Sequence, residues 1–256
     1  MKKITKIFIP LNKKYFEIPF NKEYKKFISN DLVFINLPDM GKNIAKIKEV
    51  EKSKNNEKNF KELSILHKAS EDDLTTWEKR KEEAKNDFKA FKEKIIKNKL
   101  NMIPIFGNIS FNGDFFYAGF SANERIDFRS LVKDVSVKIK KKVFFEQIGA
   151  RDRTKIIGDL GKCGQRICCK RFLDFLPSVT MHSARLQNLR SKQLENLTGI
   201  CGKLKCCLNF ESELYSKNIK KLPKIGEKVF VKGRVGKVLG LDILNQNIKI
   251  YFEKEN

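Results

Sequence analysis

All six cysteines of the chain fall within two copies of one short motif, Cys-Gly-x-x-x-Cys-Cys. The copies span residues 163–169 and 201–207, and each is preceded by Gly-x, so the shared pattern begins at Gly161 and at Gly199. The six thiols are Cys163, Cys168, Cys169, Cys201, Cys206 and Cys207. Two matched clusters, with no cysteine elsewhere in 256 residues, make chemistry at sulfur the first hypothesis.

Clustered thiols of this kind favour a metal centre. Thiolate ligands select zinc, copper(I) or iron–sulfur clusters. Neighbouring cysteines such as Cys168 and Cys169 diverge in direction, so a polynuclear cluster or a subunit interface uses both more easily than a single ion does. Six thiols are too many for one four-thiolate site and too few for two complete ones. Either one cluster takes four of them, or partner chains complete the ligand sets.

Other roles fit the cysteines less well. Buried at two helix starts, they would act only as small hydrophobic side chains. A catalytic thiol needs a base, and neither His67 nor His182, the only histidines, has a predictable relation to a cysteine. His182 would be a metal ligand only if its helix packed against the cysteines, and such a residue lies more often on a polar helix face.

Positive charge surrounds both motifs. The basic residues nearest to the cysteines are Arg166, Lys170, Arg171, Lys203 and Lys205. Positive charge of this kind lowers the pKa of thiols and offsets the negative charge of a thiolate cluster. The same side chains are also suited to bind phosphate.

The whole chain is strongly basic, with 54 Lys and Arg against 31 Asp and Glu and a formal net charge of +23. This excess predicts attraction to polyanions, most simply nucleic acid or an acidic protein surface. Lys, Asn, Ile and Phe are plentiful together, as in AT-rich genomes, and such a bias raises Lys without any ligand. No run approaches the roughly 18 apolar residues of a membrane span, and the apolar N-terminal stretch is too short for a signal peptide. We expect a cytoplasmic protein with reduced thiols.

The order of apolar and polar segments predicts an α+β chain with four parts. These are an N-terminal β module (1–58), a ferredoxin-like domain (59–150), the cysteine region (151–221) and a small C-terminal β segment (222–256). Strands are expected at residues 7–9, 15–18 and 32–35, and the polar stretch 51–59 is expected to be a linker.

Residues 61–149 read as strand, helix, two strands, helix, strand, the ferredoxin-like βαββαβ order. A strand is expected at 63–66, a helix from Ser70 to about Lys99 with one apolar stripe, a second helix at 127–135 and a last strand at 142–148. Asn112-Gly113 predicts a two-residue type I′ turn between strands at 102–111 and 114–120. On the second of these strands, Phe115 and Tyr117 share a face that could stack RNA bases, although packing against a neighbouring module is favoured.

The cysteine region is expected to hold helices at 170–176, at 179–190 and after Cys207. The C-terminal segment is glycine-punctuated and alternates apolar with polar residues. It predicts a small SH3-like barrel or a curled hairpin, which is a binding platform more often than a catalytic one.

With these residues in view, the chain resembles the RicT (YaaT) family of bacterial regulators, which carries the polymerase-suppressor-type C-terminal domain. The double cysteine motif in this setting is highly specific, and the resemblance covers nearly the whole chain in order. The matching stretches are residues 127–134, 147–152, 158–169, 184–189, 198–208 and 222–226.

The resemblance implies a regulatory subunit that is not an enzyme. RicT-like proteins join two small helical subunits, RicA and RicF, in a complex that carries 4Fe–4S clusters with shared cysteine ligands. That complex modulates endoribonuclease Y in mRNA processing and turnover, and its loss affects sporulation. All six cysteines fall on the family's motif positions, which makes each an expected cluster ligand. A zinc-stabilised protein that binds RNA or DNA is the alternative, and RNA is a further expected partner.

Overall fold

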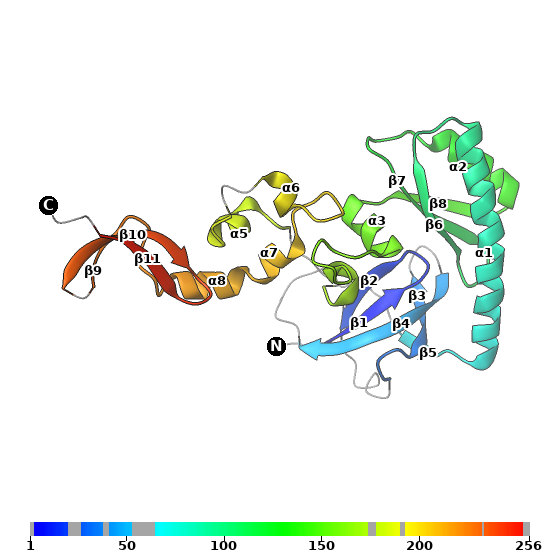
Figure 1. Ribbon diagram of the computed structural model, residues 1–256. Helices are drawn as coiled ribbons and strands as arrows, with labels where there is room; N and C mark the ends of the chain where they lie inside the picture. The colour runs from blue at the N-terminus through cyan, green and yellow to red at the C-terminus, as the bar shows by residue number, and fades with distance from the viewer. Residues whose placement is uncertain are drawn as a thin grey trace. The chain divides into compact units, whose positions relative to one another are not determined.

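The computed structural model describes residues 3–19, 27–37, 41–52, 65–173, 178–189, 193–231 and 233–252. The chain divides into two compact units, Met1–Ile157 and Gly158–Asn256 (Figure 1). The four parts expected from the sequence are a finer division, which stays a prediction. Among the described residues, none of the helices combines the length and apolar character that a membrane span needs.

The first unit begins with a five-stranded antiparallel sheet in the order β2-β1-β4-β3-β5. Its strands are β1 (Lys3–Ile9), β2 (Lys14–Pro19), β3 (Leu32–Leu37), β4 (Gly41–Lys52) and β5 (Ile65–Lys68). The three strands predicted within residues 7–35 are confirmed. The long strand β4 escaped prediction because its many Lys and Glu residues obscure the alternation, and the expected linker 51–59 begins two residues inside it. Residues 53–59 of that linker lie outside the described residues.

The second sheet of this unit has three strands, β6 (Ile103–Ile109), β7 (Phe115–Ser121) and β8 (Lys142–Gln147), in that order. Strand β7 is antiparallel to β6 and parallel to β8. The predicted ferredoxin-like arrangement is wrong at its first strand, since β5 pairs with β3 of the other sheet. Only Ile65 of β5 is buried, and it packs in the core of the five-stranded sheet, which explains the different partner.

Two helices cover one face of the three-stranded sheet. Helix α1 (Glu71–Lys97) begins as predicted at Ser70, whose hydroxyl accepts from the Asp73 backbone while the Asp73 carboxylate accepts from the Ser70 backbone. This reciprocal capping box fixes the start of the helix. Helix α2 (Arg129–Ile139) begins two residues later than expected. The shared core of helices and sheet is formed by Ala84, Phe91, Ile95, Met102, Ile109, Phe116, Ala118, Phe120, Leu131 and Val135.

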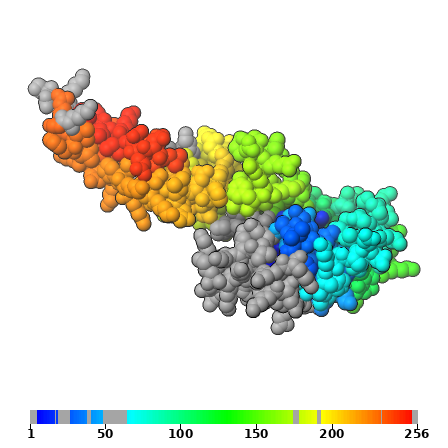
Figure 2. Space-filling model, turned by 90° about the horizontal axis from the view of Figure 1, so that it is seen from below, coloured from blue at the N-terminus to red at the C-terminus, as the bar shows by residue number. Residues whose placement is uncertain are grey.

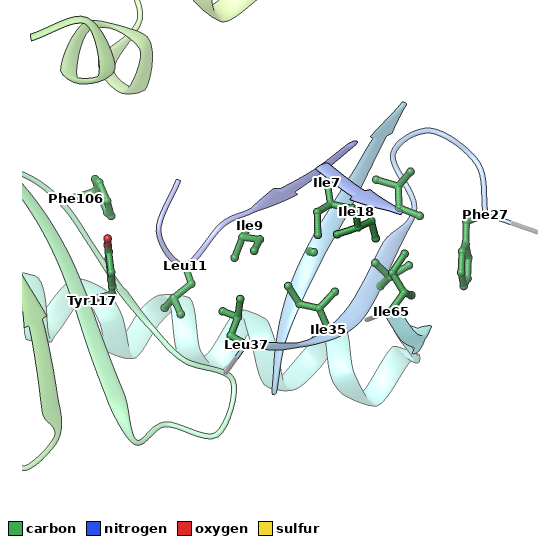
Figure 3. Packing of buried hydrophobic residues seen from close by; sticks show 13 residues of the cluster. Ile7, Ile9, Leu11, Ile18, Phe27, Ile35, Leu37, Ile65, Phe106 and Tyr117 are labelled. Atoms are coloured by element: carbon green, nitrogen blue, oxygen red, sulfur yellow. The ribbon is translucent and has the colours of Figure 1, made fainter. Parts of the chain in front are cut away.

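The opposite face of the three-stranded sheet packs against the five-stranded one. Tyr117 and Phe106 lie in the same apolar cluster as Ile9, Leu11 and Leu37 (Figure 3). The Tyr117 side chain is buried, and its hydroxyl donates to Glu146. The packing interpretation of this face is therefore confirmed for Tyr117, and its ring is not free to stack bases.

The turn between β6 and β7 is formed, but it is not the predicted two-residue type I′ turn. The Ser110 N–H donates to the Phe115 carbonyl, which leaves four residues in the loop, and the Gly113 N–H donates to the Ser110 carbonyl. Gly113 has a positive φ of 89°, whereas Asn112 does not. A longer loop is stabilised here because the buried Ser110 hydroxyl accepts from the Phe115 backbone.

The second unit contains short helices and a separate sheet. After α3 (Ala150–Ile157) of the first unit, its helices are α4 (Cys168–Arg171), α5 (Met181–Leu186), α6 (Leu194–Leu197), α7 (Cys206–Phe210) and α8 (Ser212–Ile219). Helix α5 lies within the expected range 179–190, and α7 includes Cys207. The helix expected at 170–176 is displaced, since α4 begins at Cys168 and shares only residues 170 and 171 with that range. Residues 174–177 and 190 lie outside the described part. A small core of Ala184, Leu197 and Leu208 holds α5, α6 and α7 together.

The C-terminal strands are β9 (Lys228–Val231), β10 (Arg234–Asp242) and β11 (Asn247–Tyr251), which form an antiparallel sheet in the order β11-β10-β9 (orange to red in Figure 1). The predicted barrel is not formed by the described residues. Three strands are too few to close a sheet on itself.

Candidate metal centre: two cysteine hairpins

The first cysteine motif folds as a tight hairpin. The Gly161 N–H donates to the Gln165 carbonyl at 2.7 Å, and the Gly164 N–H donates back to the Gly161 carbonyl at 2.9 Å. A β-bridge joins Leu160 to Arg166 just outside the turn. Gly164 has φ 76°, a left-handed conformation that glycine adopts without a Cβ penalty. Cys163 therefore lies at the tip of the turn, immediately before this glycine.

The second motif repeats this backbone. The Gly199 N–H donates to the Lys203 carbonyl at 2.8 Å, and the Gly202 N–H donates to the Gly199 carbonyl at 3.0 Å. The bridge of this hairpin joins Thr198 to Leu204, and Gly202 has φ 72°. The sequence repeat is thus a structural repeat, with equivalent hydrogen bonds at equivalent positions.

Each hairpin leads directly into a short helix whose first two residues are the adjacent cysteines. Cys168 and Cys169 begin α4, and Cys206 and Cys207 begin α7. The residue before each pair has nearly the same extended conformation, with ψ 132° in one copy and 130° in the other. All three cysteines of a motif are consequently placed by one continuous turn and helix.

The thiols differ in exposure. Cys163 is exposed, Cys169 is buried, and Cys168, Cys201, Cys206 and Cys207 are partly buried. A Cβ on Gly161 would lie 3.4 Å from the Cys163 sulfur, and one on Gly199 would lie 3.8 Å from the Cys201 sulfur. The Cys163 sulfur therefore lies back over Gly161, and the Cys201 sulfur lies back over Gly199.

The two copies lie side by side within the second unit. Helix α4 contacts α7, and the rings of Phe172 and Phe210 meet edge to face with centroids 5.3 Å apart. The Lys162 ammonium at the tip of the first hairpin donates to the Glu195 carbonyl at 2.6 Å, just before the second hairpin. Phe172 and Phe210 occupy equivalent positions of the repeat, four residues after Cys168 and Cys206. Contact between equivalent residues is the pattern of a two-fold pairing.

Sequence reasoning missed Phe172 and Phe210 as parts of the site. The signal was present, because the repeat extends beyond the second pair of cysteines to an aromatic residue at the same offset in both copies. Both rings remain substantially exposed, at 49% and 60%. They place exposed apolar surface four residues after the first cysteine of each adjacent pair.

Electrostatics at the centre depart from the expectation that the basic residues dominate. The pKa of the Cys207 thiol is raised, chiefly by burial, then by electrostatic interaction with Glu211 and with Cys168. Lys205 acts in the expected direction but is outweighed. The interaction of Cys168 with Cys207 also shows that the repeat brings these two thiols near each other.

Other expected site residues lie apart from this pair. His182 is exposed on α5, and His67 stacks on Phe34 in the first unit with ring centroids 5.0 Å apart. Within the described part of the chain, no three Cys, His, Asp or Glu side chains are grouped so as to hold a metal ion. The thiol donors suit a soft metal, but a complete four-thiolate centre is not assembled by these residues alone.

Two domain families match the chain. Residues 63–148 match the PSP1 C-terminal conserved region, and residues 178–222 match the third domain of PSP1-like proteins. The first match contains α1, α2 and the three-stranded sheet, and the second contains α5 to α8 with the second cysteine hairpin. Fold and site thus define a PSP1-type protein.

A curated relative narrows this class. The chain is 34% identical to the stage 0 sporulation protein YaaT of Bacillus subtilis over 186 residues, which are 73% of this chain and 67% of YaaT. The chain therefore belongs to the YaaT (RicT) family, which confirms the resemblance seen in the sequence. The comparison with solved structures gives no significant match.

Proposed function

We propose that this protein is a non-catalytic regulatory subunit that supplies cysteine ligands to iron–sulfur clusters. The duplicated hairpin supports the proposal, since two equivalent hairpins, each continued by a short helix, hold three thiols apiece and lie side by side. Cluster sulfides are commonly stabilised by nearby backbone N–H groups, and the glycines at the hairpin tips keep that backbone uncovered. A Cβ at Gly164 or Gly202 would meet open space.

Partner subunits complete the ligand sets in this proposal. The described thiols do not form a closed group of ligands, and Cys163 at a hairpin tip is exposed. The exposed rings of Phe172 and Phe210 adjoin the cysteines and supply apolar contact area for a partner. By the family resemblance, the partners are small helical subunits of the RicA and RicF kinds.

The proposed regulatory target rests on the family resemblance. The relative YaaT is named as a stage 0 sporulation protein. We propose that the assembly modulates an endoribonuclease Y-type enzyme and thereby mRNA processing and turnover in the cytoplasm. The protein itself contributes ligands and contacts, not a catalytic group.

Anaerobic co-purification with the two small subunits tests this proposal. We expect a brown complex that contains iron and acid-labile sulfide, and loss of both in the double variant Cys168→Ser/Cys207→Ser. Gln165→Ala/Lys203→Arg is the matched control, because it changes equivalent exposed side chains of the same hairpins and keeps the positive charge and every thiol. Zinc in place of iron and sulfide would support the alternative of a zinc-stabilised nucleic-acid-binding protein.

A further inference from the structure

The first unit contains a hollow of about 320 Å³ that lies apart from the cysteines. It is bounded by β1 and the turn after it, by β3 and β4, by the first half of α1, and by β6 with its following turn. Residues of β1 to β4 (blue) and of α1 (cyan) adjoin at the surface of this unit (Figure 2). The volume is at the low end of the range for small-ligand pockets.

Hydrogen bonds between the elements hold the walls of the hollow in place. The Asn108 side-chain amide donates to the carbonyls of Pro10 and Leu11, at 3.0 and 2.9 Å. The Phe111 N–H donates to the side-chain oxygen of Asn43 at 3.2 Å. These bonds connect the two sheets of the unit, so the hollow is part of the folded framework.

Four cationic side chains line the hollow, Lys13, Lys46, Arg80 and Lys81, and no Asp or Glu is among the described lining residues. Like charges held together in a partly buried place repel one another. Burial and the charge of Lys81 both lower the pKa of Lys13. A bound anion would remove this repulsion.

Lys13 and Lys46 are the cations available to a ligand. Arg80 is engaged by Glu83 at 2.7 Å and by the Phe111 and Asn112 carbonyls, and Lys81 is engaged by Glu78 at 2.5 Å. Glu78 and Glu83 are not lining residues. Within the described residues, no carboxylate pairs with Lys13 or Lys46.

Aromatic rings form the rest of the wall. Phe8, Phe111 and Trp77 line the hollow, and the Lys81 ammonium lies 3.5 Å from the centre of the Trp77 ring. Cationic groups for a phosphate beside flat rings for a base are what proteins use to bind unpaired nucleotides. Inorganic phosphate would leave the rings unused, and an acidic peptide would not require them.

We propose that this hollow binds one nucleotide of a single-stranded RNA, with its phosphate on Lys13 and Lys46 and its base against the face of the Trp77 ring opposite to Lys81. The net charge of +23 attracts the RNA chain, and the hollow receives one of its units. The site lies in the first unit and needs no cysteine, so it is independent of the iron–sulfur proposal.

The fluorescence of Trp77, the single tryptophan of the chain, reports directly on the hollow. Titration of the full-length protein with a short single-stranded oligouridylate should give a saturable change in this fluorescence. The same titration in the Cys168→Ser/Cys207→Ser background should give the same curve, which separates this test from the fate of the cluster. Binding should weaken as salt rises, with a logarithmic slope of about −0.7 for each phosphate that the protein neutralises.

A pair of charge-matched variants assigns the binding to the hollow. Lys13→Gln/Lys46→Gln should weaken binding and flatten the salt slope by about 0.7 for each phosphate that is no longer neutralised. Lys85→Gln/Lys89→Gln, which removes the same charge from exposed positions on α1 outside the hollow, should bind like the wild type. Trp77→Ala, followed through the anisotropy of labelled RNA, should weaken binding roughly tenfold, since stacking on an aromatic ring contributes to each base bound.

Thermal unfolding of each variant shows whether it is folded at the temperature of the titration. Equal affinity of the two double-lysine variants would overturn the proposal. So would a response to uridine monophosphate or inorganic phosphate with none to the oligonucleotide, because the site would then serve a free small anion.

Discussion

At the scale of single residues, each cysteine hairpin contains a glycine in the left-handed conformation, Gly164 in the first and Gly202 in the second. Gly164 and Gly202 have positive φ, and a Cβ on either would meet no other atom within 4 Å. Any effect of substitution there comes from the backbone conformation alone. The two positions therefore give a clean test of how the hairpins hold their thiols.

We expect Gly164→Ala or Gly202→Ala to lower the free energy of unfolding of the second unit by about 1 kcal/mol, because L-residues other than glycine are strained in the left-handed region. Asn at the same positions should cost less, since Asn adopts this region more readily. Chemical denaturation followed by circular dichroism measures the difference. Gly240→Ala in β10 is the control, since its φ is outside this region and its Cβ has only an ordinary contact at 3.9 Å. Equal losses for Gly164→Ala and Gly240→Ala would contradict the argument.

At the scale of elements, α1 is the main support of the first unit. It contributes Ala84, Phe91 and Ile95 to the core, and its side chains tie neighbouring elements together. Glu83 and Asp87 both bind the Lys141 ammonium at 2.7 Å, just before β8. The helix start and this ion-pair group each allow a separate test.

The capping box at the start of α1 should be a measurable part of its stability. Ser70→Ala removes the hydroxyl that accepts from the Asp73 backbone at 3.2 Å. We expect a loss of about 1 kcal/mol in the free energy of unfolding, the usual value for an N-cap residue. Ser70→Thr should restore most of it, because its hydroxyl can both accept from the Asp73 backbone and donate to the Asp73 carboxylate, as Ser70 does. If Ser70→Ala and the wild type were equally stable in urea titrations, tertiary packing alone would determine where helix α1 begins.

The group around Lys141 should make the first unit sensitive to acid. The pKa of Glu83 is lowered, first by its hydrogen bond to Lys141 and also by Arg80. A carboxylate whose folded pKa is depressed stabilises the fold above its unfolded value of about 4.3, and this contribution is lost as the pH falls through the lower folded value. Glu83→Gln should therefore flatten the decline in unfolding free energy on acidification below about pH 4.3. Glu82→Gln, which removes an exposed carboxylate from the same helix, is the matched control. A Glu83→Gln profile that follows the wild type would contradict this role.

Some local signals were read correctly from the sequence, whereas the pairing of distant segments was not. The extent of α1 followed from the Ser70 cap and the spacing of its apolar residues, although Ile96, which has this spacing, is 76% exposed. The partner of β5 did not follow, because a four-residue strand carries no information about which sheet it joins. The loop at Gly113 is longer than expected because Ser110 and Asn43 bind its backbone, and Asn43 is remote in sequence.

The same difference between local and long-range features applies to the candidate sites. The repeat identified all six thiols, because each copy is local in sequence. The pairing of Phe172 with Phe210 and the nearness of Cys168 to Cys207 depend on how the copies pack. The basic and aromatic hollow was not foreseen, since its lining comes from five elements and two turns, whose separate residues are unremarkable in a Lys-rich and Phe-rich chain.

At the scale of the whole molecule, the cysteines and the largest hydrophobic cores lie in different units. All six cysteines lie in Gly158–Asn256, and the first unit contains none. The core clusters that include Ile9 and Phe116 belong entirely to the first unit, whereas the second unit has a small core of Ala184, Leu197 and Leu208. A small core leaves a domain more dependent on a metal or a partner for its stability.

We therefore expect Cys168→Ser/Cys207→Ser to affect the two units differently. Iron content and association with partner subunits should fall, because serine is a poor ligand for iron, while the unfolding transition of the first unit should keep its midpoint. Trp77 lies in the first unit, so its fluorescence during denaturation follows that unit separately, and circular dichroism follows both. Gln165→Ala/Lys203→Arg, which keeps the positive charge and every thiol, should leave iron, association and both transitions unchanged. If the Trp77 transition moved together with the loss of metal, the metal would stabilise the whole molecule, as a structural zinc site does, and the regulatory iron–sulfur interpretation would give way to the zinc alternative.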